Sequence, residues 1–266
     1  MEYLASSLSG RLEDMEADAE GIAPEYSTSD GSVNVVYLNG VLHGHLDAGG
    51  MRTLLPFTMA MPFRHCLRAD YRPLDALCPV ADRWFDMMLP DTDTRRFVME
   101  MVGYILYHRN MSELPALFIL FGPGGTGKST IAKMIANILG PESYSKLGLT
   151  DLANEFTRAS QMDGKLLNIC EEASDQSRRE IGLDIGLLKR LSDGDIIPIN
   201  NKGVKAYSAR NTAKLLFTTN VRPDFGSDDG IVRRLYRVPF LNKILIPADD
   251  YRVLMSQDGN TWLAMR

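Results

Sequence analysis

A glycine-rich segment from Gly122 to Ser129 has residue types and spacing suited to holding a phosphate group. It satisfies the pattern G-x-x-x-x-G-K-[ST], between an apolar strand expected over 116–121 and an amphipathic helix expected over 128–139. Glycines let such a loop curl until several backbone N–H groups face one point, where the helix dipole also favours negative charge. Lys128 is expected to neutralise the β- and γ-phosphates, and Ser129 to offer its hydroxyl to Mg²⁺. The nucleotide-binding residues predicted on this basis are Gly122, Pro123, Gly124, Gly125, Thr126, Gly127, Lys128, Ser129 and Thr130.

Two adjacent carboxylates, Glu171 and Glu172, follow a second apolar run at 166–170. A strand of this kind, lying beside the strand that enters the P-loop, would deliver both acids to the γ-phosphate. Glu171 could then hold Mg²⁺, directly or through water, while Glu172 polarises the attacking water. The alternative is a solvated pair of acids with no role beyond ending the strand.

A third apolar run, expected as a strand over 213–218, leads to Asn220. An amide at this point can donate to the γ-phosphate and accept from the attacking water, although a turn-forming asparagine is the alternative. Arg233 and Arg234 follow, and an arginine directed at a γ-phosphate stabilises the charge of phosphoryl transfer. We favour Arg234 as a residue that reaches a neighbouring subunit, with Arg233 second and a structural salt bridge as the competing use.

A basic stretch, residues 187–214, separates the acidic pair from Asn220. Short strands are expected over 196–199 and 204–207, with Gly203 in the turn between them. This arrangement puts Lys202 at the tip of a hairpin and Lys205 on its return strand. Protruding cations suit contact with the phosphate backbone of DNA without base specificity, whereas solvated hairpin lysines are the alternative.

The elements that must position these groups indicate an α/β fold, because unbroken apolar runs alternating with helical stretches are typical of buried parallel strands with helices on both faces. Upstream, we expect a strand over 33–38, a turn at Asn39-Gly40, a return strand from Val41, and two helices separated by Pro90. Residues 1–20 are expected to form an acidic amphipathic helix. The predicted division is a leader and linker over 1–32, a lead-in domain over 33–112 and a nucleotide-binding core over 113–266.

Charge and composition leave room for a nucleic-acid partner despite a net charge of −5. Residues 1–30 contain eight of the chain's 34 acidic residues and one of its 29 basic residues. The rest of the chain therefore has 26 acidic and 28 basic residues. A near-neutral body is compatible with a local basic site. No apolar run approaches the ~20 residues of a bilayer span, and no secretory signal is visible. With three widely spaced cysteines, a cytoplasmic location is expected, and no membrane partner.

The ordered series of P-loop, Glu-Glu strand, basic hairpin, Asn strand and Arg-Arg, all within 122–234, resembles superfamily 3 helicases of the phage, plasmid and poxvirus primase-helicase branch. Lead-in stretches agree with the resemblance, among them Leu38–Leu42, Cys78-Pro79 and Gly103-Tyr104, as does Val238–Phe240 near its end. It spans about residues 33–241. Some members of the family pair the hairpin lysine with a histidine, whereas Gly203 follows Lys202 here.

The resemblance implies an AAA+-type motor that forms hexameric rings, hydrolyses ATP with Mg²⁺ at subunit interfaces and draws single-stranded DNA through its channel. For this chain it implies that one subunit contributes Lys128, Ser129, Glu171, Glu172 and Asn220, the neighbour contributes Arg234, and Lys202 leads the DNA contact. A primase or another replication protein is an implied partner. Two other functions stay open: a DNA-binding initiator that uses ATP as a switch, and a P-loop small-molecule kinase, for which the basic hairpin has no use.

Overall fold

The computed structural model describes residues 33–44, 52–56, 65–72, 78–106, 114–171, 185–199, 206–222 and 228–243. The helix expected over 1–20 and the linker after it lie outside the described residues. So do Glu172, Lys202 and Lys205. The predicted domain limits stay predictions.

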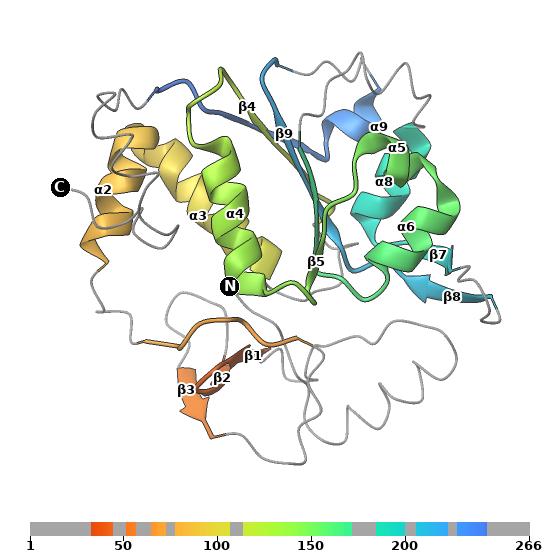
Figure 1. Cartoon of the computed structure of the whole chain (residues 1–266), viewed down its shortest axis with the longest axis horizontal. Helices are drawn as coiled ribbons and strands as arrows, with labels where there is room; N and C mark the ends of the chain where they lie inside the picture. Colours follow the sequence, from red (N-terminus) through yellow and green to blue (C-terminus); the bar gives the residue numbers. More distant parts are fainter. Residues whose placement is uncertain are drawn as a thin grey trace, which may run out of the picture.

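A five-stranded sheet forms the centre of the molecule (Figure 1). Its strand order is β10-β4-β9-β6-β5, and every neighbouring pair is parallel. The strands are β10 (Leu235–Pro239), β4 (Leu117–Phe121), β9 (Lys214–Thr219), β6 (Leu167–Cys170) and β5 (Tyr144–Ser145). The predicted α/β fold with a parallel sheet is confirmed.

The lateral order of the strands differs from one expectation. The strand that ends at the acidic pair, β6, does not lie beside the P-loop strand β4, because β9 pairs with both and separates them. The apolar runs predict which segments form strands and that these strands are parallel. The order of the strands across the sheet depends instead on where the connecting helices pack. The inserted strand places the segment ending in Asn220 between the other two.

Helices cover both faces of this sheet (Figure 1). Along β4, Phe118 and Leu120 pack into one buried cluster, while Leu117 and Ile119 pack into another, as the two-residue period of a strand requires. The first cluster lies under α2 (Pro79–Met88), α3 (Thr92–Leu106) and α4 (Lys128–Leu139). The second lies on the side of α5 (Leu149–Ala153), α6 (Glu155–Met162), α8 (Ile185–Asp193) and α9 (Asp229–Val232).

The lead-in region forms an antiparallel sheet of β1 (Val33–Tyr37), β2 (Gly40–Gly44) and β3 (Arg52–Leu55), which confirms the expected strand, turn and return strand. The segment 65–72 joins it to the core. The N–H of Leu67 donates to the Val36 carbonyl over 2.9 Å, and that of Arg68 donates to the Ile138 carbonyl over 2.6 Å. The lead-in sheet therefore supports the C-terminal end of α4, the helix that begins at the P-loop.

The basic stretch contains the expected hairpin, but its return strand was predicted too early. The strands are β7 (Ile196–Ile199) and β8 (Tyr207–Arg210), with Ile199 opposite Tyr207. This register buries Ile197 opposite Ala209, and the Tyr207 hydroxyl donates to Asp163 at the end of α6. The return strand therefore begins at Tyr207 rather than at residue 204, while residues 200–205 lie outside the described part of the chain.

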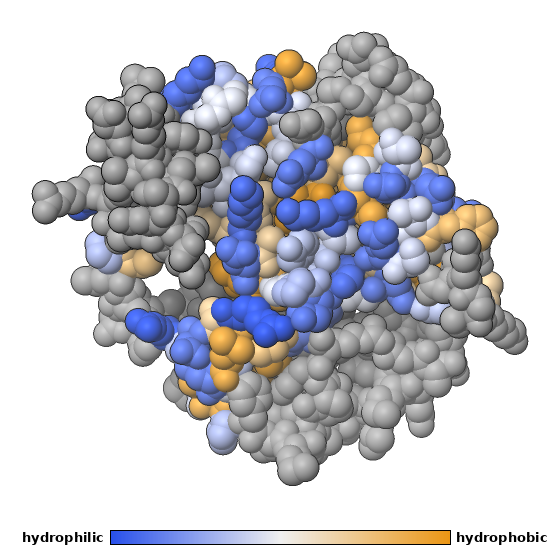
Figure 2. All heavy atoms as spheres, in the orientation of Figure 1, coloured by the Kyte–Doolittle hydropathy of each residue, from blue (hydrophilic) through white to orange (hydrophobic). Residues whose placement is uncertain are grey.

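The described surface is predominantly hydrophilic on the face shown in Figure 2, where hydrophobic residues occur in separate groups. Leu38 and Leu54 of the lead-in region are among the exposed large hydrophobic residues. Among the described residues, none of the helices combines the length and the apolar character that crossing a bilayer requires.

Candidate nucleotide site

The P-loop leaves the carboxyl end of β4 and turns directly into α4, which begins at Lys128 and ends at Leu139 as predicted. Gly125 and Gly127 have φ values of +79° and +86°, a left-handed conformation that L side chains rarely adopt. No described atom lies within 4 Å of where a Cβ on Gly124 or Gly125 would stand. Gly127, the N-cap of α4, makes no side-chain cap, so the first N–H groups of the helix are left uncapped.

The first glycine of the loop is required by a different contact. A Cβ on Gly122 would stand 2.0 Å from the Phe240 carbonyl oxygen, in a backbone with φ of +145°. The N–H of Phe240 donates to the Phe121 carbonyl over 2.8 Å, and that of Gly122 donates to the Thr219 carbonyl over 3.2 Å. The loop is thus held at its entry by the ends of both neighbouring strands.

The Lys128 side chain is buried beneath the loop. Its Nζ donates to the carbonyl oxygens of Gly122 and Pro123 over 2.6 and 2.7 Å, and lies 3.3 Å from the Thr126 hydroxyl. Burial lowers the pKa of Lys128. An anion bound above the loop would favour the charged ammonium, because an opposite charge nearby raises the pKa of a lysine.

A cavity of about 220 Å³ opens above the loop at the carboxyl edge of the sheet. Glu171 and Asn220 line it together with residues 124–130. Two strand spacings, about 10 Å, separate the ends of β4 and β6. The structure therefore brings the P-loop, Glu171 and Asn220 around a space wide enough for a phosphate group and a water molecule.

Two residues that line the cavity, and a third that pairs with Glu171, were not singled out from the sequence. Thr218 and Thr219 line the cavity. They are the last two residues of β9, immediately before Asn220, and both are buried. Lys146 follows β5, and its Nζ lies 3.8 Å from Oε1 of Glu171, with both side chains about half exposed. The two threonines could have been found from the sequence, because they directly precede Asn220 at the carboxyl end of the same strand. No sequence pattern links Lys146 with Glu171.

Arg234 lies at the opposite edge of the sheet from the P-loop. It immediately precedes β10, and its carbonyl accepts from the N–H of Leu117 at the start of β4. About 13 Å of strand separates this point from the P-loop. Its guanidinium donates to both oxygens of Asp193 over 2.6 and 2.7 Å and to the Gly230 carbonyl. Arg234 is thus engaged in a salt bridge with Asp193 of α8 within its own chain.

Comparison with known proteins adds information on the fold. Residues 120–234 match a family of unknown function, DUF5906. No curated protein matches the chain. The apo structure of the NrS-1 C-terminal region superposes with a TM-score of 0.54 and 14% identity, over 88% of this chain and 65% of that one. The chain shares that fold.

Two further structures were also matched. The A form of the apo NrS-1 C-terminal region gives a TM-score of 0.52 and 14% identity, covering 88% of this chain and 64% of that one. A crystal structure of JCV helicase with a bound acetamide compound gives 0.47 and 16% identity, covering 71% and 52%. This chain therefore spans just under two thirds of the NrS-1 region whose fold it shares.

Proposed function

We propose that this chain is an ATP-hydrolysing DNA helicase of the superfamily 3 type, which forms a homo-hexameric ring and moves along single-stranded DNA. The observation that supports this most strongly is the cavity lined by Lys128, Glu171 and Asn220. A phosphate-binding loop, a carboxylate and an amide at one sheet edge are the groups that hydrolysis of a nucleoside triphosphate needs.

The residues at the cavity fit Mg²⁺-ATP. The open faces of Gly124 and Gly125 and the uncapped start of α4 suit an anion, while Ser129 and Glu171 offer the oxygen ligands that Mg²⁺ prefers. The cavity's ~220 Å³ is below the ~300–1,000 Å³ of typical small-molecule pockets. It suits the phosphates, so the base and sugar would lie beyond it.

Each residue has a separate task in the proposed reaction. Water would attack the γ-phosphorus of ATP, and the bond from that phosphorus to the β–γ bridging oxygen would break, so that ADP and phosphate leave. Lys128 would turn from its loop carbonyls to the β- and γ-phosphates, Ser129 and Glu171 would hold Mg²⁺, and Glu172 would take the proton from the attacking water. Asn220 would orient that water.

The arginine that completes the site would come from a neighbouring subunit, because Arg234 and its own P-loop lie at opposite edges of the sheet. Arg234 shares its guanidinium with Asp193, which favours the second choice, Arg233. The Arg233 side chain is exposed and makes no hydrogen bond or ion pair with the described part of the chain. We therefore propose Arg233 as the residue in contact with the neighbour's nucleotide, held in place by Arg234.

The test is strand displacement on a tailed duplex, preceded by size analysis with ATP and single-stranded DNA. We expect a ring-sized species, ATP-dependent displacement, and loss of both displacement and turnover in Glu172→Gln while ATP binding is kept. Lys202→Ala should bind single-stranded DNA more weakly and with a shallower salt dependence. A monomer that hydrolyses ATP without responding to DNA would contradict the proposal.

The same experiment separates the two other functions. An ATP-dependent initiator would bind DNA with ATP but leave the duplex intact. A small-molecule kinase would ignore DNA and transfer phosphate to a metabolite. The β7–β8 hairpin favours the DNA-dependent functions, because it carries a basic connection on an element that is not needed at the nucleotide cavity.

A further inference from the structure

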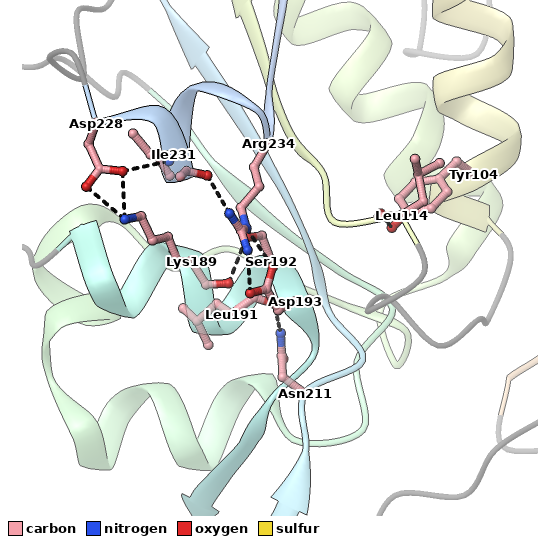
Figure 3. A network of polar contacts seen from close by, with 11 residues as sticks. Tyr104, Leu114, Lys189, Leu191, Ser192, Asp193, Asn211, Asp228, Ile231 and Arg234 are labelled. Atoms are coloured by element: carbon pink, nitrogen blue, oxygen red, sulfur yellow. Dashed lines mark hydrogen bonds and ion pairs between the residues drawn. The ribbon is translucent and has the colours of Figure 1, made fainter.

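The base of the β7–β8 hairpin and the turn that carries the two arginines both meet the last turn of α8. Figure 3 shows Asn211 from the hairpin base, and Asp228 and Arg234 from the other turn, beside residues 189–193. We call residues 228–234 the arginine turn. The contacts on either side of α8 are independent of one another and involve different atoms.

The hairpin is bonded to α8 at both of its ends. Gly194, with φ of +68°, ends the helix, and the N–H of Asp195 donates to the Arg190 carbonyl over 3.0 Å, as in a Schellman motif. On the return side, the N–H of Asn211 donates to the Asp195 carbonyl over 3.0 Å, and its side-chain amide donates to the Leu191 carbonyl over 2.7 Å. The base of the hairpin is thus fixed to the last turn of α8.

The arginine turn is bonded to the same helix by two ion pairs. Asp193 accepts both bonds from Arg234, and Lys189 lies 2.7 Å from Asp228, which also caps α9 by accepting from the N–H of Ile231 over 3.1 Å. Lys189 and Asp193 are four residues apart and lie on one face of α8 (Figure 3). The arginine turn is therefore held at both its start and its end.

The two ion pairs differ in strength. The Arg234 and Asp193 side chains are only 18% and 24% exposed, and the bidentate geometry fixes orientation as well as distance. Lys189 and Asp228 are 28% and 46% exposed and form a point contact. Asp193 is therefore the dominant connection between α8 and the arginine turn.

We propose that Asp193 is a positioning residue that fixes the arginine turn relative to the base of the β7–β8 hairpin, so that single-stranded DNA on the hairpin raises ATP turnover at the neighbouring subunit. This inference rests on the proposed function. A displacement of the hairpin base moves the last turn of α8, which carries both Leu191 and Asp193, and Arg234 follows because its two bonds leave little freedom. The adjacent Arg233 then shifts at the subunit interface.

The test compares ATP turnover with and without single-stranded DNA in the full chain. In Asp193→Asn we expect the ratio of the two rates to fall by at least about fivefold, the lower end of typical coupling between sites, with ATP affinity unchanged. Lys189→Met, one turn earlier on the same face, should reduce the ratio less. Arg68→Ala removes an exposed ion pair with Glu142 far from α8 and should leave it unchanged.

A mixed-ring experiment separates positioning from a folding defect. Asp193→Asn subunits keep an intact P-loop, and Lys128→Ala subunits keep an intact arginine turn, so rings made from both contain some complete sites. Recovery of DNA-stimulated turnover in such rings is expected, whereas misfolded subunits would give none. If Asp193→Asn fails to fold, Arg234→Lys removes the bidentate geometry while keeping the charge and has the same expected result.

The outcomes distinguish this inference from the proposed function. Wild-type protein without any DNA stimulation of turnover would contradict the helicase itself. Two other results would overturn the role of Asp193 and leave the helicase in place, provided that DNA stimulates turnover in the wild type. One is an unchanged ratio of the two turnover rates in Asp193→Asn. The other is no recovery of DNA-stimulated turnover in mixed rings that have been shown to co-assemble.

Discussion

Three polar side chains at the carboxyl edge of the central sheet differ in exposure and in hydrogen bonding from two polar side chains at its amino edge. At the carboxyl edge, Ser129, Glu171 and Asn220 are exposed around an open cavity. At the amino edge, Arg234 and Asn211 are bonded to α8. The groups proposed to bind a ligand are exposed, whereas the groups that hold elements together are hydrogen-bonded within the chain, because a buried polar group without a partner is costly. Substitutions should therefore affect ligand chemistry at one edge and stability at the other.

The largest effect is expected from Lys128→Ala at the carboxyl edge. Loss of this cation should lower ATP turnover by about 10²- to 10³-fold, the effect of removing one hydrogen-bond donor that stabilises transition-state charge in an active site. Stability should change little, since the described hydrogen bonds of its ammonium are all within the P-loop. Turnover and calorimetric ATP binding are the measurements, with the exposed Lys133→Ala on the same helix as control. A loss of less than about tenfold would contradict the assignment.

A pair of asparagines gives the sharpest comparison of the two edges. Asn211→Ala removes a buried amide that bonds the carbonyls of Leu191 and Ala213, and should lower the free energy of unfolding by about 2–3 kcal/mol. Asn220→Ala removes an exposed amide at the cavity and should lower turnover without a change in stability. Urea unfolding and ATPase rates on both variants test this. The reverse pattern would remove the distinction between the edges.

The buried Lys214, the first residue of β9, predicts a pH dependence of stability. Burial lowers its pKa from 10.5 to about 7, so between these values the unfolded chain binds more protons than the folded one. Stability should therefore rise as pH increases from 7 toward 10. In Lys214→Met this pH dependence should be absent. Urea midpoints at pH 7, 8 and 9 test this, and parallel curves for both proteins would contradict it.

The smallest effect is expected from Lys146→Met. The ion pair with Glu171 is half exposed, and such pairs contribute about 0–1 kcal/mol, so unfolding should change by less than that. The visible result should be a lower half-saturating Mg²⁺ concentration for turnover, by about fivefold or less, because Glu171 loses a competing cation. A higher Mg²⁺ requirement would instead show that Lys146 assists binding.

Local features of the fold could be predicted from the sequence, whereas pairings between distant segments could not. The strand, loop and helix around Lys128 follow from short-range pattern, and α4 has the predicted bounds. The two residues of β5 are too few to show a periodicity, and β10 contains Arg237 and Pro239 within a short run. Neither strand was predicted.

The same limit applies to the candidate site. Glu171 and Asn220 were identified because parallel strands end at one edge, which holds whatever their lateral order. The partner of Arg234 lies 41 residues earlier, and no periodicity connects the two. A salt bridge was foreseen as the competing use of this arginine, but Asp193 was not foreseen as its partner. The roles of Glu172, Lys202 and Lys205 stay predictions.

The contact between Gly122 and Phe240 limits how far the chain can be shortened from its C-terminal side. The matched family region stops at residue 234, before β10 and before the backbone that closes over the first glycine. A recombinant fragment limited to residues 120–234 would lack the first three residues of β4, all of β10, and the Phe240 carbonyl that confines the loop's entry. Such a fragment should bind ATP poorly with every motif residue present, and any deletion series should retain Phe240.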